Sequence, residues 1–247
     1  MRLELQPLLD SDFPEMVSAQ WTSFENPYSG LLRVVGPIFN GDRAASLATN
    51  VTVQLAQHKS TPESNWVKVV DADAGNKLAG AARWLIFEHD PFEKPEIVAD
   101  WWPEATIGRE FATRVLLQLE EPRKQRARRP HLYLHIAFTL PEYRGHGVAR
   151  MFIQWGTQKA DAMGLECWLD ASDNGRPVYP KYGFIEVLDF CLDPDMDEDA
   201  MSEAEREELR ELRDLVIPTH LTCMWRPKGG KYVEGVTIKP WEMDSKA

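Results

Sequence analysis

The sequence is poor in cysteine and in positive charge. Its 247 residues include three cysteines, Cys167, Cys191 and Cys223, and 28 lysines and arginines against 39 aspartates and glutamates. A low, odd cysteine count without a secretory signal argues against a disulfide scaffold and predicts a reduced, cytoplasmic environment. The net charge of -11 argues against nucleic acid or an anionic membrane as the main partner, and it mildly favours a cationic partner such as an amine.

Long apolar runs are also missing. No stretch approaches the roughly 20 apolar residues that a membrane-spanning helix needs, so no membrane partner is expected. The first residues, Met1 to Gln6, alternate and carry charge, which predicts a strand and not a signal peptide. With 43% hydrophobic residues, the chain can bury a core, and its length fits one large domain or a domain with insertions.

The usual glycine-rich nucleotide motifs are absent as well. The segment Arg144 to Gly147 reads Arg-Gly-His-Gly and lacks both the Lys-Ser/Thr pair of a P-loop and the third glycine of the dinucleotide fingerprint. It lies between a predicted strand, His131 to Thr139, and an amphipathic helical pattern that runs to Met163. Two glycines at a helix N-terminus free backbone N–H groups to converge, an arrangement that binds anions and above all phosphate.

The strand before this segment alternates. Its residues divide into one face with Leu132, Leu134 and Ile136 and another with Tyr133, His135 and Ala137. Pro141 ends the strand, because proline cannot donate to a ladder.

The rest of the chain divides into short elements. Alternating patterns predict further strands at residues 2–8, 66–70, 77–87, 165–170, 186–190 and 219–225, of which 66–70 and 77–87 form a hairpin. Helical patterns predict helices at about 10–21, 42–58 and 107–119. Residues 26–30 are predicted as a break and 89–102 as an interruption. The basic segment 121–130 is interpreted as a solvated turn, with nucleic-acid contact as the alternative. The acidic segment 193–214 is predicted to be a surface insertion with some helix.

Two motifs in this order resemble a known family. Arg144, Gly147 and Ala149 match the pattern Arg/Gln-x-x-Gly-x-Gly/Ala, and Tyr179 stands four residues before Gly183-Phe184. Both are signatures of the GNAT superfamily of acyl-CoA-dependent N-acyltransferases, here most similar to fungal-type members with a Gly-Arg-Pro-x-Tyr segment. The resemblance implies an α/β (α+β) fold with a twisted, mostly antiparallel mixed sheet flanked by helices. It implies a single domain over 1–247, with insertions near 88–130 and 193–216 and a polar C-terminal tail.

The resemblance also implies acetyl-CoA as co-substrate and an amine of a small molecule or peptide as acceptor. The pyrophosphate would bind at Arg144, Gly145, His146, Gly147, Val148 and Ala149, with His146 at the rim. Pantetheine would lie along the backbone of Ala137, Phe138 and Thr139, where the strand splays from its neighbour. Asn174 is a further candidate for contact with pantetheine, although Asn174-Gly-Arg-Pro177 departs from the family's commoner Asn-x-x-Ala run. The basic segment 121–130 offers an alternative contact for the 3′-phosphate, and the acidic segment 193–214 is expected to be dispensable for coenzyme A binding.

Acyl transfer to an amine needs a base and an acid. The resemblance implies Tyr179 as the acid for the leaving thiolate, because relatives place a tyrosine four residues before the Gly-Phe pair, near the sulfur. Tyr182 is the neighbour most easily confused with it. The resemblance implies a base at His135, because many relatives carry a glutamate or aspartate at the corresponding position of this strand. Histidine is largely neutral at pH 7 and could accept a proton there; a packing histidine is the alternative. No metal site is expected, because His131 and His135 supply too few ligands.

Aromatic residues are candidates for the acceptor site, with a role in the core as the alternative for each. Trp21, Phe24 and Tyr28 would form one wall, and Trp101 and Trp102 another. An aromatic wall would suit an apolar or cationic substrate. Three other functions stay open at this point: acetylation of a protein lysine or N-terminus, transfer to oxygen, and binding of acyl-CoA without catalysis.

Overall fold

A computed structural model of the chain, which describes residues 1–242, contains a seven-stranded sheet in the order β1-β2-β3-β4-β5-β7-β6. Only β4 and β5 are parallel; every other neighbouring pair is antiparallel. The expected mostly antiparallel mixed sheet is therefore confirmed. The strands are β1 (Leu3–Pro7), β2 (Ser64–Asp71), β3 (Lys77–Phe87), β4 (His131–Thr139), β5 (Glu166–Ser172), β6 (Ile185–Leu192) and β7 (Thr219–Arg226).

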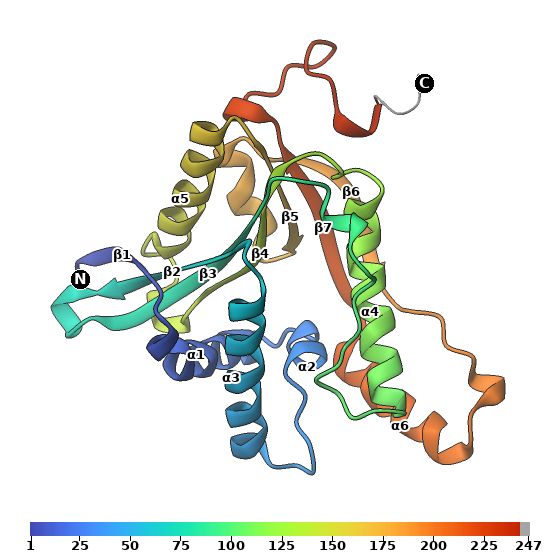
Figure 1. Cartoon of the computed structure of the whole chain (residues 1–247). Helices are drawn as coiled ribbons and strands as arrows, with labels where there is room; N and C mark the ends of the chain where they lie inside the picture. The colour runs from blue at the N-terminus through green and yellow to red at the C-terminus, as the bar shows by residue number, and fades with distance from the viewer. Residues whose placement is uncertain (243–247) are drawn as a thin grey trace.

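Helices cover both faces of this sheet (Figure 1). They are α1 (Phe13–Glu25), α2 (Leu31–Val35), α3 (Arg43–Ser60), α4 (Ile107–Lys124), α5 (Val148–Met163) and α6 (Glu203–Val216). On one face, Trp84 of β3 packs so closely against α5 that a Cβ added at Gly156 would lie 2.1 Å from its ring. On the other face, Phe24 of α1 packs against Phe138 of β4, and Arg123 of α4 contacts Tyr133 of β4 and Asp170 of β5. Strand β4 thus lies between α5 and the pair α1 and α4.

A bulge interrupts the alternation of β4. Arg83 of β3 pairs with Ile136, and the next residue, Trp84, pairs with Leu134, so His135 is an extra residue on β4. Directly paired side chains share a face, and a bulge shifts the alternation by one residue. Leu134 therefore lies on the α5 face with Trp84, whereas Ile136 lies on the opposite face with Arg83. This corrects the sequence-based prediction that Leu134 and Ile136 share a face.

Strands β4 and β5 separate beyond this bulge. Their pairing begins at His131 and Glu166 and ends at Leu134 and Leu169. From residue 135 onward β4 pairs only with β3, and β5 continues alongside β7. Figure 1 shows the two halves of the sheet fanning apart, with β1–β3 toward the left and β7 and β6 toward the right. One edge of β4 is therefore open to another extended chain along residues 135–139.

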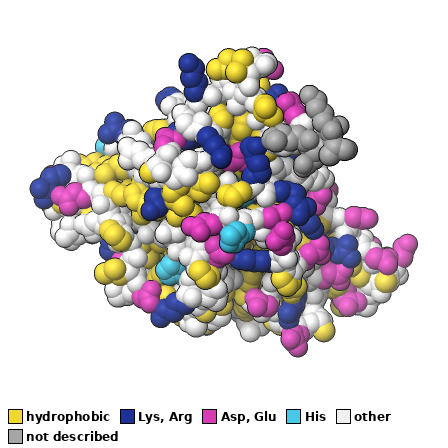
Figure 2. All heavy atoms as spheres, turned by 45° about the horizontal axis from the view of Figure 1, so that its top comes forward, with side chains coloured by type: hydrophobic (Ala, Val, Ile, Leu, Met, Phe, Trp, Pro, Cys, Tyr) yellow, Lys and Arg dark blue, Asp and Glu magenta, His cyan; other side chains and the backbone are white. Residues whose placement is uncertain are grey.

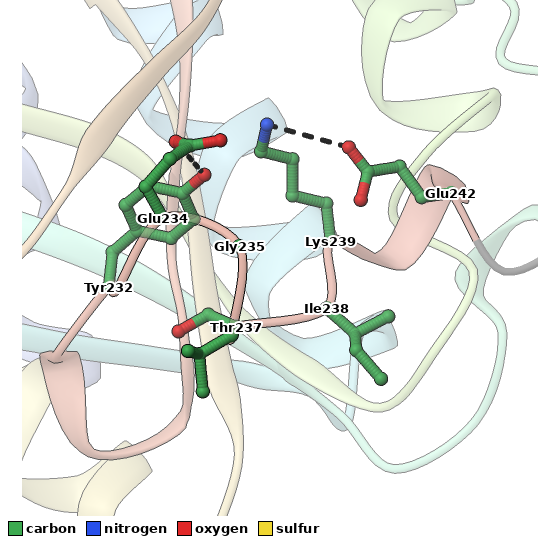
Figure 3. Close-up of a pocket in the computed structure, with 8 residues that line it drawn as sticks. Tyr232, Glu234, Gly235, Thr237, Ile238, Lys239 and Glu242 are labelled. Atoms are coloured by element: carbon green, nitrogen blue, oxygen red, sulfur yellow. Dashed lines mark hydrogen bonds and ion pairs between the residues drawn. The ribbon is translucent and has the colours of Figure 1, made fainter.

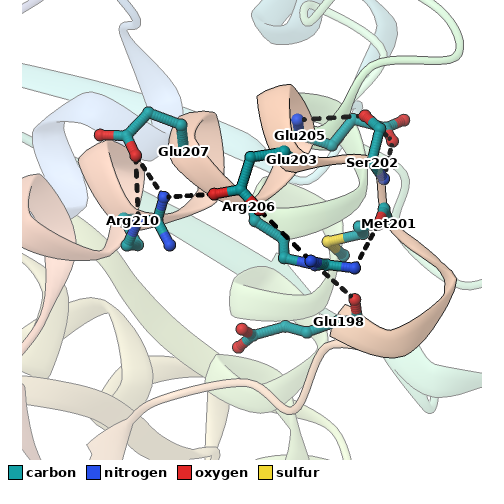
Figure 4. Close-up of polar contacts among 8 residues, drawn as sticks. All are labelled: Glu198, Met201, Ser202, Glu203, Glu205, Arg206, Glu207 and Arg210. Atoms are coloured by element: carbon teal, nitrogen blue, oxygen red, sulfur yellow. Dashed lines mark hydrogen bonds and ion pairs between the residues drawn. The ribbon is translucent and has the colours of Figure 1, made fainter.

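The acidic segment is more than a solvated insertion. Its helix α6 starts with a capping box between Ser202 and Glu205, and ion pairs of Arg206 and Arg210 with Glu203 continue along its exposed side (Figure 4). Acidic side chains gather on the right of the face in Figure 2. The other side of α6 is apolar and packs in a second core with α4 and α2. Buried members of that core from this segment are Met196, Met201, Leu209, Leu212 and Val216.

Two other predicted segments also change. Helix α2 forms after the predicted break at 26–30. Helix α4 runs to Lys124, five residues past the predicted end, so the basic segment 121–130 begins inside a helix. Arg123 and Ala127 are buried, which contradicts a fully solvated turn. In residues 1–242, no helix is both long and apolar enough to cross a membrane.

Candidate functional site

The loop before α5 presents free backbone donors. Gly145 and Gly147 adopt positive φ angles of 77° and 88°, which glycine tolerates without strain. Gly147 is the N-cap of α5 and caps with no side chain. Within the described residues, the amides of Gly145, Gly147, Val148, Ala149 and Arg150 have no hydrogen-bond acceptor, and the first helical bond comes from Met151 to the Gly147 carbonyl. Five unpaired N–H groups at a helix N-terminus form a site for an anion.

Space and charge at this loop also suit an anion. No atom lies within 4 Å of a Cβ built on Gly145 or Gly147. Arg144 is exposed and braces the loop, because its guanidinium donates to the carbonyls of Ser23 (3.0 Å) and Thr139 (3.3 Å). His146 differs from its neighbours, since its own amide already donates to the Tyr143 carbonyl. The loop therefore joins α1 to the end of β4 and leaves its donors facing solvent.

The open edge of β4 leads to this loop. Phe138 is buried against Phe24, whereas Ala137 and Thr139 are half-buried. Because the edge has no partner strand here, its backbone groups can bond an extended ligand. The loop and the edge together form a continuous path from the start of α5 to His135.

His135 lies where β4 and β5 separate. Its ring is exposed to solvent, and it contacts the Tyr133 ring at 5.8 Å between centroids. Its position deep among other protein atoms lowers its pKa well below 6.5, and the charges of Arg83 and Arg123 lower it further. Because solvent reaches the His135 ring, burial lowers its pKa less than it would in a sealed site. Repulsion by the two arginines acts in the same direction, so the pKa of His135 stays below 6.5. His135 is thus neutral at pH 7, as a base requires.

Tyr179 lies on the other side of the separation, in the 3-10 helix Arg176–Tyr182 that follows β5. Its ring packs against Phe184, and burial raises its pKa to about 12. The hydroxyl has no hydrogen-bond partner in the part of the chain described. Tyr182 also packs against the main core. Asn174 is exposed in the turn after β5.

The predicted acceptor residues do not form two open walls. Trp21 is fully buried, and its indole N–H donates to Asn50 (2.9 Å). Trp102 is buried, and both Trp101 and Trp102 donate to the Val34 carbonyl. These tryptophans are therefore placed in or against the cores and not at a surface that a ligand reaches freely. Phe24 is half-buried beside β4. Tyr28 is exposed, and its hydroxyl donates to the Leu215 carbonyl at the end of α6.

Charged residues that were not predicted from the sequence also border the separation of β4 and β5. Arg123 of α4 donates to the Asp170 carboxylate (2.8 Å), which also accepts from the Tyr133 hydroxyl (2.9 Å). Asp170 directly follows the last residue of β5 that pairs with β4, so this cluster borders the separation on the β5 side. Arg83 borders it on the β3 side. A charged residue inside the apolar run Ala79 to Leu85 was the available signal for Arg83.

Other hollows carry no comparable chemistry. One of about 150 Å³ lies in the C-terminal segment (Figure 3). Its polar side chains pair with each other, Tyr232 with Glu234 and Lys239 with Glu242. In Figure 1 this segment lies at the top, above the sheet. No group of three or more residues that could ligate a metal occurs in residues 1–242.

Comparisons with known proteins agree with this geometry. Solved structures resemble the fold over nearly their whole length. One described as histone acetyltransferase HPA2 and related acetyltransferase, from Corynebacterium glutamicum, has a TM-score of 0.56 at 18% identity and covers 96% of this chain and 100% of its own. Arylalkylamine N-acetyltransferase 2 from Aedes aegypti has a TM-score of 0.58 at 16% identity, with coverages of 92% and 99%. The C-terminal condensation domain of Ebony, in complex with β-alanyl-dopamine, has a TM-score of 0.57 at 14% identity, with the same coverages. These identities establish the fold alone.

Sequence comparison goes further than these structures. Among curated proteins, no sequence matches the chain. The model of the acetyltransferase (GNAT) family, however, matches residues 36–184, more than half of the chain. That range includes the separated strands, the donor loop before α5 and Tyr179. By this match and by its fold, the chain belongs to the acetyltransferase (GNAT) family.

Proposed function

We propose that this protein transfers the acetyl group of acetyl-CoA to a primary amine. The observation that carries the proposal is the continuity between the donor loop and the open edge of β4. A pyrophosphate would accept from the amides of Gly145, Gly147, Val148, Ala149 and Arg150, next to the Arg144 guanidinium. Pantetheine would extend along residues 137–139, which brings the thioester toward the bulge at His135.

The proposed proton transfers follow from the two candidate side chains. An amine with a pKa near 10 arrives protonated and cannot attack until it loses that proton. Neutral His135 would accept it, directly or through a water molecule. A backbone N–H of β4 would then donate to the oxyanion that forms at the thioester carbon. Collapse of that intermediate releases the thiolate, which Tyr179 would protonate.

The pKa of Tyr179 changes how this last step is understood. A thiol has a pKa of about 8.5, so a phenol with a pKa of about 12 gives up its proton uphill. Tyr179 would therefore remain protonated throughout the neutral and basic range, ready to donate. The nearly matched transfer expected for an unperturbed tyrosine does not apply. The transfer would be drawn forward because the thiol leaves the site and the tyrosinate that remains regains a proton from solvent.

The test of the donor loop uses two glycines of the same helix. Gly147 precedes α5 and Gly164 follows it, both have positive φ, and neither has an atom within 4 Å of a built Cβ. A valine strains the backbone at either position, but only Gly147→Val narrows the donor loop. We expect Gly147→Val to weaken coenzyme A binding at least about 10-fold by calorimetry, with Gly164→Val unchanged. Equal affinities in the two variants would refute the site.

Catalysis needs a separate measurement. Thiol release from acetyl-CoA, followed with a panel of amines, amino acids, peptides and alcohols, distinguishes the open alternatives. Release with amines alone supports the proposal. Release with alcohols would favour O-acyl transfer, and bound coenzyme A without release for any acceptor would favour a binding protein.

A further inference from the structure

Arg83 is a buried cation without an acidic partner. Only 7% of its surface is exposed. Its Nε donates to the Ser64 hydroxyl (2.8 Å), which also lies 2.9 Å from His58 Nδ1. No carboxylate lies within ion-pair distance of Arg83 among residues 1–242. Its two terminal amino groups have no hydrogen-bond partner there, yet they are not sealed from solvent.

Such a charge is costly unless something neutralises it. Burial lowers the pKa of Arg83 to about 10, so the guanidinium still carries its charge at neutral pH. The other deeply buried arginines on neighbouring strands and helices are paired, Arg123 with Asp170 and Arg226 with Asp161. Arg83 is thus the exception, and its free donors are available to an anion that the protein itself does not supply.

The bulge brings Arg83 to the candidate base. Arg83 pairs directly with Ile136, and His135 is the extra residue that precedes Ile136 on β4. The side chain points to the face that carries Ile136 and Tyr133, away from α5. Its positive charge reaches His135. An anion bound by Arg83 would therefore lie beside the group that deprotonates the amine.

We propose that Arg83 binds a carboxylate of the acceptor, so that the acceptor is an amino acid or another amine that carries a carboxyl group. The inference rests on the proposed acetyl transfer to an amine. The two free amino groups of a guanidinium match the two oxygens of a carboxylate. With the carboxylate on Arg83, the neighbouring amine of the same small molecule would face His135 and the end of the pantetheine path.

The test compares acceptors that differ only in the carboxylate. Thiol release is measured with each amino acid, its C-terminal amide and its decarboxylated amine. The ratio of kcat/KM between the amino acid and the decarboxylated amine reports the contribution of the carboxylate. We expect this ratio to favour the amino acid and to fall about 10- to 100-fold in Arg83→Met, the size of a hydrogen bond to a charged group.

Variants and controls separate binding from folding. Arg83→Lys keeps the charge but loses the planar fork, so it should give an intermediate ratio. Arg114→Met, on the exposed side of α4, should leave the ratio unchanged. Replacing an unpaired buried charge by an apolar side chain is expected to leave stability equal or higher. A strong loss of stability in both Arg83 variants would instead make Arg83 a structural residue and overturn the proposal.

Failure of this inference is distinguishable from failure of the proposed function. Thiol release with amines of any kind, but with a ratio near one or unchanged in Arg83→Met, overturns the carboxylate site and leaves acetyl transfer intact. A preference for phosphate-bearing amines over carboxylates would overturn it as well. If no acceptor yields thiol, acetyl transfer fails, and calorimetry of the amino acid and its amide with coenzyme A present still decides whether Arg83 binds the carboxylate.

Discussion

Two buried arginines border the separation of β4 and β5, and their surroundings are opposite. Arg123, on the β5 side, donates to Asp170 and lies 3.8 Å above the Tyr133 ring. Burial alone would lower its pKa, but interactions with Tyr133 and Asp170 raise it overall. Arg83, on the β3 side, has only the Ser64 hydroxyl as a hydrogen-bond partner, and burial lowers its pKa.

This difference separates architecture from binding. The Arg123 cluster is internally neutral, and it fastens the end of α4 to the point where the two strands part. Because its charges cancel, this cluster has no net positive charge to offer an anion, although Asp170 Oδ1 has no hydrogen-bond partner among residues 1–242. Arg83 keeps unused donors on the same face of the sheet, and His135 lies within reach of both charges. The uncompensated side is therefore the one suited to recognition.

Breaking the neutral cluster should have the largest effect. Asp170→Asn leaves the Arg123 charge buried without its carboxylate, and loss of one partner of a buried pair costs about 3–5 kcal/mol. Chemical denaturation should show this loss, whereas Arg83→Met should change the free energy of unfolding by less than about 1 kcal/mol. A larger loss in Arg83→Met than in Asp170→Asn would reverse the comparison.

The residue between the two charges should control turnover. His135→Gln should reduce kcat about 100-fold, at the low end for loss of a general base, with coenzyme A affinity nearly kept. In the proposed mechanism neutral His135 accepts the proton of the amine, so activity should fall as the pH drops through the pKa of His135. Since that pKa is lowered, the acidic limb of the wild-type profile should lie well below pH 6.5.

His135 faces two cations, Arg83 and Arg123, and the Tyr133 ring. Arg83→Met removes one of these two cations. It should therefore move the acidic limb of the profile to higher pH. A limb that stays in place in this variant, or full activity in His135→Gln, would remove His135 from the mechanism.

Tyr179, on the β5 side, should have a smaller effect. Tyr179→Phe deletes only a hydroxyl, so stability should hardly change while kcat falls about 10-fold. No basic limb from Tyr179 is expected below about pH 12, because burial raises its pKa to that value. Tyr182→Phe is the matched control and should keep full turnover; a loss in Tyr182→Phe instead would exchange the two roles.

The smallest effect should come from making the two sides alike. Ser64→Asp puts a carboxylate where the Ser64 hydroxyl accepts from Arg83, so Arg83 becomes paired like Arg123. The free energy of unfolding should rise by up to about 1 kcal/mol, because the buried cation gains a counter-charge. KM for a carboxylate-bearing acceptor should rise several-fold while KM for acetyl-CoA stays constant. An unchanged acceptor KM would mean that Arg83 is not free for a ligand in the wild type.

Local patterns were enough to predict the elements that we propose bind coenzyme A. The strand His131–Thr139, the strand Lys77–Phe87 and the helix from Val148 to Met163 occur where the sequence predicts them. Their alternation, helical spacing and glycines act over a few neighbouring residues, so a single sequence reports them. The donor loop and Tyr179 were identified for the same reason, through short motifs within these elements.

The high acidic content of residues 193–214 led to the wrong prediction that this segment is a solvated insertion. Leu209, Leu212 and Val216 follow helical spacing and are buried, but eleven acidic side chains between Asp193 and Asp214 dominate the composition. The partners of this stripe are α4 and α2, which lie far away in the chain. Burial of α6 therefore depended on contacts that composition does not reveal.

The sequence by itself determined the family motifs, the strands and helices around them and the presence of a charge in an apolar strand. Only the tertiary structure decided the bulge at His135, the separation of β4 from β5 and the absence of a counter-charge for Arg83. An extra residue in a strand changes its register against a partner strand and leaves the local pattern almost unaltered. Whether a buried charge is paired depends on side chains that reach it from other elements, as Asp170 reaches Arg123 and no acid reaches Arg83 in residues 1–242.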